Sequence, residues 1–210
     1  MEVEQLERVP GLENHYGPCL RFLNQAQFHP LKYMKALCER IQKMGGTIYT
    51  NTHVNKIDHT GIGTDGGFEI KAKHIVVATN SPINNMVVMH LKQYAYRTYL
   101  IGAKIKKDSL PASLWWDTGD FSVNEDIPPY HYVRTQKLDQ QHDLLLIGGE
   151  DHPTGLADIE GKPEEERYAA LESWAKEYFG VDDFIYRWSG QVMETMDSLA
   201  FIGRNPMDKD

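Results

Sequence analysis

The stretch Phe28–Asn80 constrains the fold most, because it joins a clear helix signal to a succession of strand signals. Pro30 suits the first turn of a helix, where its missing N–H costs nothing, and the pair Gly45-Gly46 ends the helical pattern. Between them, apolar side chains recur at the spacing of one helix face, at Leu31, Met34, Leu37, Cys38 and Ile41. The pattern predicts a helix that begins at Pro30.

Strand signals follow this helix. Thr47–Thr50 and Val54–Ile57 carry β-branched residues, and Phe68–Ile70 comes after a glycine-rich turn. Ile75–Ala78 is a continuous apolar run without polar alternation, which is typical of a strand covered on both faces. We therefore expect Ile75–Ala78 to lie inside a sheet, or to be unusually exposed where its neighbours in that sheet are missing.

The rest of the chain has the pattern of an antiparallel sheet with a second helix. Strands are predicted at Leu20–Leu23, Tyr94–Ile105, Leu114–Trp116, Tyr130–Thr135, Leu144–Ile147, Ile185–Gly190 and Leu199–Ile202. Pro163–Phe179 predicts a helix, because glutamates fill its first turn and an apolar face follows at Tyr168, Leu171, Trp174 and Tyr178. The predicted fold class is therefore α+β.

Composition limits the classes of function. A chain of 210 residues can form one large domain or two small ones, and its net charge of -8 argues against binding to nucleic acid or to an anionic membrane surface. The two cysteines, Cys19 and Cys38, lie in unrelated contexts and predict neither a disulfide nor a thiolate metal site. No apolar stretch approaches the roughly 18 residues of a membrane span. We expect a soluble, cytoplasmic protein.

The segment GIGTDGG, with Gly61, Gly63 and Gly66, matches the spacing GxGxxG of dinucleotide-binding folds. That fingerprint requires a strand before it and a helix after it, because the N-terminus of the helix holds the pyrophosphate. Here Phe68–Ile70 continues as a strand, so the sequence predicts a hairpin turn. We therefore give a low rank to the hypothesis that the chain is an NADP-linked reductase that uses these glycines.

The nine histidines form no recognisable metal-ligand spacing, and no metal site is predicted. Nucleophilic catalysis has no better support. Ser189 lies in WSGQ rather than in GxSxG, and Cys38 lies on the apolar face of the first helix, where a buried structural thiol is the simpler role. The sequence therefore names no catalytic residue.

Arg97 and Arg134 are candidate substrate-binding residues. Each lies in a predicted strand beside tyrosines, and Tyr132 is the neighbour that we expect to assist Arg134. A guanidinium on a sheet face can hold a carboxylate through two parallel hydrogen bonds, and a tyrosine hydroxyl can add a third. The alternative is that these arginines simply point outward into solvent.

The order of these elements resembles that of the FAD-dependent oxidoreductases of the D-amino-acid-oxidase, glycine-oxidase and sarcosine-oxidase superfamily. The pieces that match are His29-Pro30, Gly45-Gly46, Ile48–Thr50, Val54–Ile57 and VVATN from Val76 to Asn80. HYVRT followed by LLLIGGE resembles strands of the family's substrate sheet. Trp188–Pro206 resembles the segment W-x-G-x-R-P-x-T-x-D-x-x-P-x-I-G, which passes near the flavin. The resemblance spans nearly the whole chain.

This resemblance implies FAD as the cofactor, and oxidation of a small amine or amino-acid-like substrate by hydride transfer to the flavin. It implies cofactor-binding residues at Val54, Ala78, Thr79, Asn80, Trp188, Gly190 and Gly203. The fold is then a mixed, largely antiparallel substrate-domain sheet with flanking helices, plus a strip of a Rossmann-like FAD-binding domain. The implied division is 1–28 and 83–188 for the substrate domain, 29–82 for the strip, and 189–210 for the return toward the FAD domain.

The chain departs from the family pattern in two ways. It has neither the N-terminal GxGxxG segment nor the C-terminal glycine-rich segment of the flavin site, so we expect a middle fragment that alone is inactive and binds FAD poorly. Gln191 and its neighbours stand where amine-oxidising relatives carry an arginine, and a glutamine cannot supply a charged fork. The implied partners are the substrate and the remainder of its own FAD domain. Some relatives also carry a downstream Rieske iron-sulfur module.

A second hypothesis makes the chain a non-catalytic ligand- or protein-binding domain with a mixed sheet. In that case Trp115, Trp116 and Tyr130 form an aromatic patch that faces a partner. Flavin absorbance of the full-length protein separates the two hypotheses, because only the first requires a yellow protein.

Overall fold

The computed structural model describes residues 2–12, 17–80, 83, 92–118, 130–154 and 163–203. The end of the predicted flavin-facing segment beyond Gly203 lies outside the described residues. The chain divides into two compact units, of which the first comprises Met1–Gln27 and Ala95–Val192. The second comprises Phe28–Tyr94 and Met193–Asp210. The assignment of parts of the chain to substrate and FAD domains stays a prediction.

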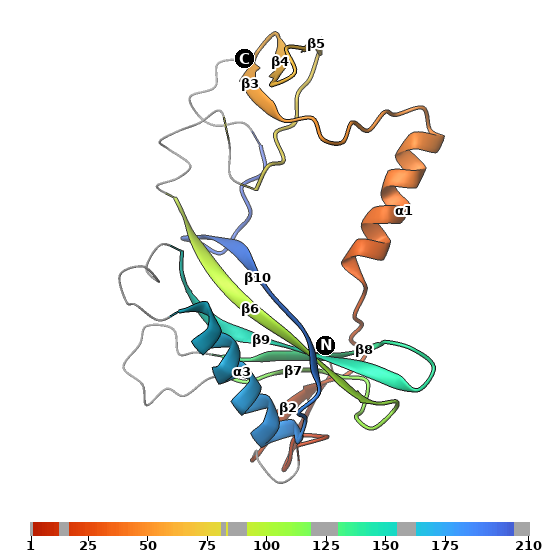
Figure 1. Ribbon diagram of the computed structural model, residues 1–210, viewed down its shortest axis with the longest axis vertical. Helices are drawn as coiled ribbons and strands as arrows, with labels where there is room; N and C mark the ends of the chain where they lie inside the picture. The colour runs from red at the N-terminus through yellow and green to blue at the C-terminus, as the bar shows by residue number, and fades with distance from the viewer. Residues whose placement is uncertain are drawn as a thin grey trace. The chain divides into compact units, whose positions relative to one another are not determined.

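The first unit is built on a five-stranded sheet with the strand order β10-β6-β9-β8-β7 (Figure 1). β9 pairs antiparallel with β6 and β8, and β8 pairs antiparallel with β7, as the alternating pattern predicts. β9 and β10 are longer than predicted. The strands are β6 (Gln93–Lys106), β7 (Leu114–Trp116), β8 (Tyr132–Lys137), β9 (His142–Pro153) and β10 (Phe184–Thr195).

Helix α3 (Glu164–Phe179) covers one face of this sheet and confirms the predicted second helix. Its side chain Leu171 and the strand side chains Ile101, Leu145 and Ile147 are fully buried. Glutamates occupy its first turn, where the helix dipole favours negative charge. Gly180 ends it at φ 64°, a left-handed conformation that favours glycine.

The N-terminal segment contributes a separate two-stranded antiparallel sheet to the first unit. β1 (Val3–Leu6) pairs with β2 (Cys19–Phe22), which lies within one residue of the predicted strand. Two side-chain hydrogen bonds connect this segment to the large sheet. The Trp115 indole N–H donates to the Pro10 carbonyl at 2.9 Å, and the Gln27 amide donates to the Thr135 carbonyl at 3.4 Å.

Helix α1 (Pro30–Lys43) begins the second unit at the predicted proline. The ring of His29 caps it by accepting a hydrogen bond from the Lys32 backbone N–H. No residue of α1 is buried, and its apolar stripe is exposed, up to 76% at Leu31. The predicted amphipathic helix is therefore present, but the described residues of its own unit do not cover the apolar face.

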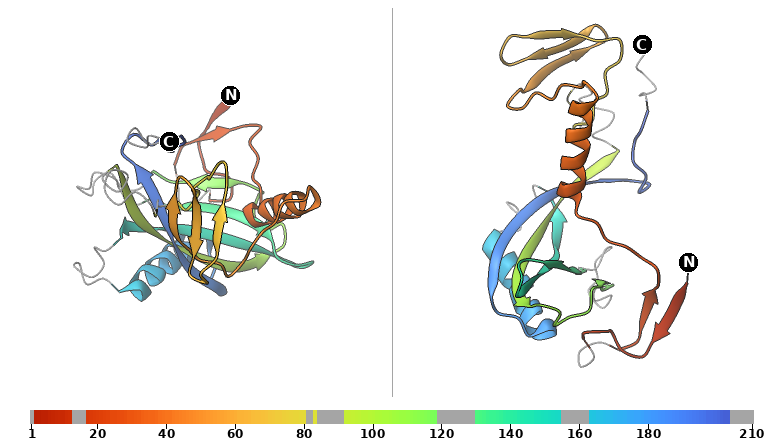
Figure 2. Two further views of the ribbon diagram at one scale, coloured as in Figure 1. Left: turned by 90° about the horizontal axis from the view of Figure 1, so that it is seen from above. Right: turned by 90° about the vertical axis from the view of Figure 1, so that its right-hand side faces the viewer.

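The second unit also holds a three-stranded antiparallel sheet of β3 (Val54–Asp58), β4 (Gly61–Thr64) and β5 (Glu69–Lys71) (Figure 2). The glycine-rich segment leads into β5 and not into a helix, which confirms the predicted hairpin. The turn itself lies at 65–67, however, because Gly61–Thr64 is a strand. A side chain at Gly61 would overlap the Ile70 carbonyl, so close strand contact explains this glycine.

Three predicted strands are wrong: Thr47–Thr50, Ile75–Ala78 and Leu199–Ile202 have no strand structure. Their β-branched and apolar residues fit a pleated surface, but a strand also needs a neighbour to accept its backbone hydrogen bonds. Ile75–Ala78 has none among the described strands. Val76 is 88% exposed, in agreement with the expectation for an apolar run that lacks its sheet neighbours.

Substitution Leu171→Ala should lower the free energy of unfolding of the first unit by about 2 to 5 kcal/mol, because the side chain is fully buried between α3 and the sheet. Chemical denaturation followed by tryptophan fluorescence measures this loss. Leu114→Ala is the matched control, since it removes the same atoms from a side chain that is 55% exposed in the same unit. Equal losses for the two variants would contradict the described core.

Candidate functional site

The two faces of the large sheet differ in chemistry. Val133 of β8 packs into the core under α3, and side chains alternate along a strand. Its neighbours Tyr132 and Arg134 therefore point to the opposite face, which we call the Tyr132 face. The face that α3 covers is called the α3 face. The predicted pair Tyr132 and Arg134 thus lies on one surface.

Tyr132 is held firmly on its face. Its hydroxyl forms a 2.7 Å hydrogen bond with the Thr98 hydroxyl of β6. Its ring lies over Gly148 of β9, where any side chain would overlap the ring. Burial raises the pKa of the Tyr132 hydroxyl, the hydrogen bond with Thr98 opposes this shift, and the charge of Asp151 adds to it. Tyr132 is therefore a neutral phenol at physiological pH and can serve as a hydrogen-bond donor.

Aromatic side chains extend this surface. Trp116 pairs with Tyr132 across β7 and β8 and is 72% exposed. The rings of Trp116 and Tyr130 stack with centroids 5.2 Å apart. The Tyr130 hydroxyl donates to a carboxylate oxygen of Asp151 at 3.1 Å. With the guanidinium of Arg134, the Tyr132 face offers flat apolar surface beside donors that suit a carboxylate.

Trp115 lies on the other side of the sheet and corrects the predicted aromatic patch. Its ring packs edge-on against Phe179 of α3, with centroids 5.8 Å apart, and belongs to the border of the core. The reason is strand alternation, which sends the adjacent residues Trp115 and Trp116 to opposite faces. Of the three residues predicted for the patch, Trp116 and Tyr130 stack on each other, and Trp115 packs against α3 instead.

Arg97 also lies on the α3 face. Its guanidinium donates a 2.9 Å hydrogen bond to the Ser189 hydroxyl of β10. Hydrogen bonding to Ser189 lowers the pKa of Tyr168 of α3, which places Ser189 on the α3 face. The structure therefore brings Tyr132 and Arg134 together but places Arg97 elsewhere. Substrate binding by these three residues stays a prediction.

The predicted cofactor residues divide between the two units. Trp188 and Gly190 flank Ser189 on β10, so alternation turns them away from α3 and toward the Tyr132 face. Trp188 is 40% exposed, and the space beside the Gly190 Cα is open. The second unit holds Val54 at the start of β3, the exposed segment Ala78, Thr79 and Asn80, and Gly203.

Asn80 ends the segment VVATN. Its φ of 65° lies in the left-handed region, which favours glycine and which asparagine tolerates better than most residues. Gly203, at φ 142°, is likewise outside the usual range of side-chain-bearing residues. The backbone at both positions is therefore in a conformation that favours glycine.

The described residues do not by themselves form a dinucleotide site. Such a site needs a glycine turn between a strand and the N-terminus of a helix, where backbone N–H groups meet the pyrophosphate. The glycine turn of this chain joins β4 to β5, and Ile75–Asn80 is an extended segment outside any described strand. Among the described residues, no strand, glycine turn and helix are joined in that order.

Two further clusters have structural roles. On the α3 face, Asp117 accepts hydrogen bonds from both the backbone N–H and the ring of His131, whose imidazole stacks on Trp174 at 4.1 Å. These three residues line a groove of about 1410 Å³. The Asp117 carboxylate accepts two hydrogen bonds from the one residue His131, whose ring stacks on Trp174 of α3. The cluster therefore holds the start of β8 against α3.

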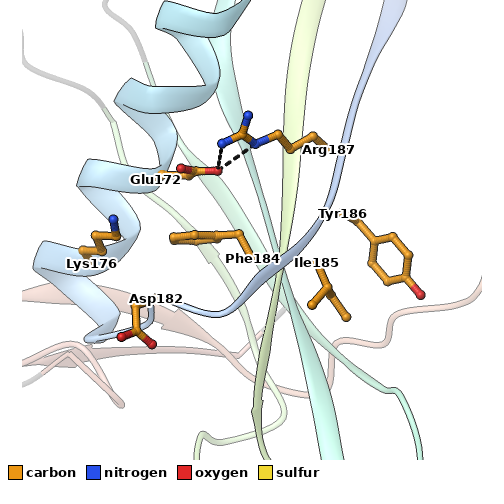
Figure 3. Close-up of a pocket in the computed structure, with 7 residues that line it drawn as sticks. All are labelled: Glu172, Lys176, Asp182, Phe184, Ile185, Tyr186 and Arg187. Atoms are coloured by element: carbon orange, nitrogen blue, oxygen red, sulfur yellow. Dashed lines mark hydrogen bonds and ion pairs between the residues drawn. The ribbon is translucent and has the colours of Figure 1, made fainter.

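A smaller pocket of about 490 Å³ lies between α3 and β10 (Figure 3). Figure 3 shows Arg187 and Phe184 directed toward the helix and Tyr186 directed away from it. The Arg187 guanidinium contacts the carboxylates of Glu172 at 2.6 Å and Glu165 at 3.1 Å. Two acids therefore already pair with this cation, and Lys176 lines the same pocket.

Sequence reasoning missed Thr98, Gly148 and Asp151. The pair Gly148-Gly149 inside an apolar strand was the available signal, since glycine in a strand often marks the close approach of another group. Thr98 and Asp151 carried no such signal, because their contacts depend on strand register. Among the described residues, no group of three His, Cys, Asp or Glu side chains is placed to hold a metal ion. In the same part of the chain, no helix is long and apolar enough to cross a membrane.

Comparison with known proteins defines the class as flavin-dependent oxidoreductases. The model of the DAO family, described as FAD dependent oxidoreductase, matches residues 2–209. The chain therefore belongs to the DAO family, whose members depend on FAD, and this confirms the resemblance found in the sequence.

One relative is a protein of Bacillus subtilis (strain 168) named "Putative Rieske 2Fe-2S iron-sulfur protein YhfW". It is 31% identical over 191 residues, which cover 89% of this chain and 34% of the relative. The chain thus spans about a third of the length of that relative. No solved structure matches the chain.

Substitution Gly148→Ala should displace the Tyr132 ring, because the added methyl group would overlap it. We expect the Thr98–Tyr132 hydrogen bond to break and the free energy of unfolding of the first unit to fall by about 1 to 3 kcal/mol, measured by chemical denaturation. The double variant Gly148→Ala/Tyr132→Ala should lose less than the sum of the two single variants. Full additivity would show that the two positions are not in contact.

Proposed function

We propose that this chain is a middle piece, mainly the substrate-binding domain, of an oxidoreductase that oxidises a small amine or amino-acid-like substrate. The observation that carries the proposal is that Tyr132 and Arg134 lie together on β8, on the face of the sheet toward which Trp188 of β10 is also directed. Family membership supplies the cofactor, and in the intact protein FAD accepts the hydride. The residues of this chain bind and orient the substrate.

Each group on the Tyr132 face has a distinct part in that role. The planar guanidinium of Arg134 suits a substrate carboxylate, which it can hold through two parallel hydrogen bonds. The neutral Tyr132 hydroxyl, fixed by Thr98, can donate a further hydrogen bond. The indole of Trp116, which pairs with Tyr132 across β7 and β8, offers apolar surface that excludes water from the substrate. Trp188 lies on β10, at the other end of the strand order, and offers apolar surface to the flavin.

The cofactor site is completed by the rest of the intact protein. We assign 29–82 to a strip of the FAD domain and 189–210 to the return toward it, and the remaining residues to the substrate domain. The piece alone binds FAD weakly and is inactive, because its glycine turn lacks the helix that would hold the pyrophosphate.

The partner of the second unit is the remainder of the same FAD domain. A helix of 14 residues is marginal in water unless its apolar face is covered, and no residue of α1 is buried. The exposed run around Val76 presents a second apolar surface in the same unit. The relative is about three times as long as the part that this chain matches. A protein of that length has enough further residues to form the rest of an FAD domain. Its name also supports a Rieske iron-sulfur module elsewhere in the intact protein.

One observation favours a second function, a non-catalytic binding domain. Trp116 is 72% exposed and stacked on Tyr130, which suits a surface for a protein or ligand partner. The two functions predict different visible absorbance for the intact protein. An intact protein with flavin absorbance supports the oxidoreductase, and a colourless protein that cannot be reconstituted with FAD supports the binding domain.

In the intact flavoprotein, Arg134→Ala should raise KM for carboxylate-bearing amines by about 10- to 100-fold, because a charge-assisted pair of hydrogen bonds is lost. Flavin reduction under anaerobic conditions measures the effect, and neutral amines should show a smaller change. Lys137→Ala is the matched control, since it removes an exposed cation from the same strand. Equal reduction of wild type and Arg134→Ala by every amine would exclude substrate binding by Arg134.

The coverage of α1 can be tested by oxidation. Met34 is exposed in the described chain, and peroxide should oxidise it at the rate of Met196, which lies exposed in a turn. In the intact protein we expect Met34 to react about tenfold or more slowly than Met196, because the FAD domain covers it. Peptide mass spectrometry gives both rates. Unchanged oxidation of Met34 would refute docking on α1.

A further inference from the structure

A directed series of hydrogen bonds crosses from the sheet to α3. Arg97 of β6 donates to the Ser189 hydroxyl at 2.9 Å. Hydrogen bonding to Ser189 also lowers the pKa of the Tyr168 hydroxyl, against the larger effect of burial. The Tyr168 hydroxyl then donates to a Glu164 carboxylate oxygen at 2.9 Å. A cation and an anion therefore terminate a series of two hydroxyls, and each bond polarises the next.

The tyrosine of this series is buried. Tyr168 is 5% exposed, and its ring packs edge-on against Tyr99 with centroids 5.3 Å apart. Burial first, and the bond to Glu164 second, raise the pKa of Tyr168 to about 12, so its hydroxyl keeps the proton that it donates.

The series acts on a strand at the end of the sheet. β10 is at the end of the described strand order, and large side chains along it are exposed, including Ile185, Tyr186 and Val192. Apolar burial alone therefore fixes β10 weakly. The Ser189 hydroxyl holds β10 from the α3 face. Because side chains alternate along a strand, the neighbouring residues Trp188 and Gly190 are then directed to the Tyr132 face.

We propose that Arg97, Ser189 and Tyr168 form a positioning unit that fixes Trp188 and Gly190 for their place beside the substrate and flavin. The proposal rests on the proposed function for what Trp188 and Gly190 face. In it Arg97 touches no substrate. It acts through Ser189, from the opposite side of the sheet.

The test uses the 210-residue chain and amide hydrogen exchange. Ser189→Ala should speed exchange of the amides of 188–190 by about tenfold, the equivalent of one lost hydrogen bond of ordinary strength. Ser189→Thr keeps the hydroxyl and should restore slow exchange. Tyr168→Phe keeps the ring but removes the hydroxyl, and should reproduce Ser189→Ala. Ser109→Ala is the control, since that hydroxyl bonds to the Lys106 carbonyl on the surface.

Two results would overturn the positioning unit. One is unchanged exchange at 188–190 in Ser189→Ala. The other is an equal rise throughout β8 and β9, which would mean a general loss of stability. A second measurement separates this inference from the proposed function: in the intact flavoprotein, Ser189→Ala should shift the visible flavin absorbance, and Ser189→Thr should not. If Ser189→Ala speeds amide exchange at 188–190 but does not shift the flavin absorbance, then Ser189 does hold this part of β10, and the flavin does not lie beside it.

Discussion

The contact between α3 and one face of the five-stranded sheet determines the arrangement of the first unit. Leu171, Ile101 and Ile147 are fully buried there, and their burial assigns every second side chain of the central strands to the interior. The side chains between them point to the opposite face of the sheet, where they can contact a ligand. The Tyr132 face is therefore a consequence of the core, and its strand residues Tyr132 and Arg134 need no loop to present them.

The helices and the long strands could be predicted from the sequence because their signals are local. Pro30 and Gly45-Gly46 mark the limits of one helix, and the acidic turn after Pro163 marks the start of the other. Ile75–Ala78 shows where local signals fail. Its composition suits a strand, but strand formation depends on a partner that composition does not reveal.

The candidate site was predictable only in part, for a geometric reason. Tyr132 and Arg134 are two residues apart on one strand, so strand alternation alone puts them on the same face. Arg97 lies on another strand, next to an irregularity in the β6–β9 register between Arg97 and Tyr99. Which face it occupies depends on the packing of α3, and no local pattern in the sequence encodes that.

The hydrogen bond from Trp115 to the Pro10 carbonyl has a consequence for folding. It joins residues 105 positions apart, and the bond from Gln27 to the Thr135 carbonyl spans 108. During synthesis the N-terminal segment must therefore wait until β7 and β8 have left the ribosome. Such long-range closure slows folding, because the entropy of a large loop is lost before the contacts form. The first residues of the chain are thus expected to be among the last parts of the first unit to reach their final positions.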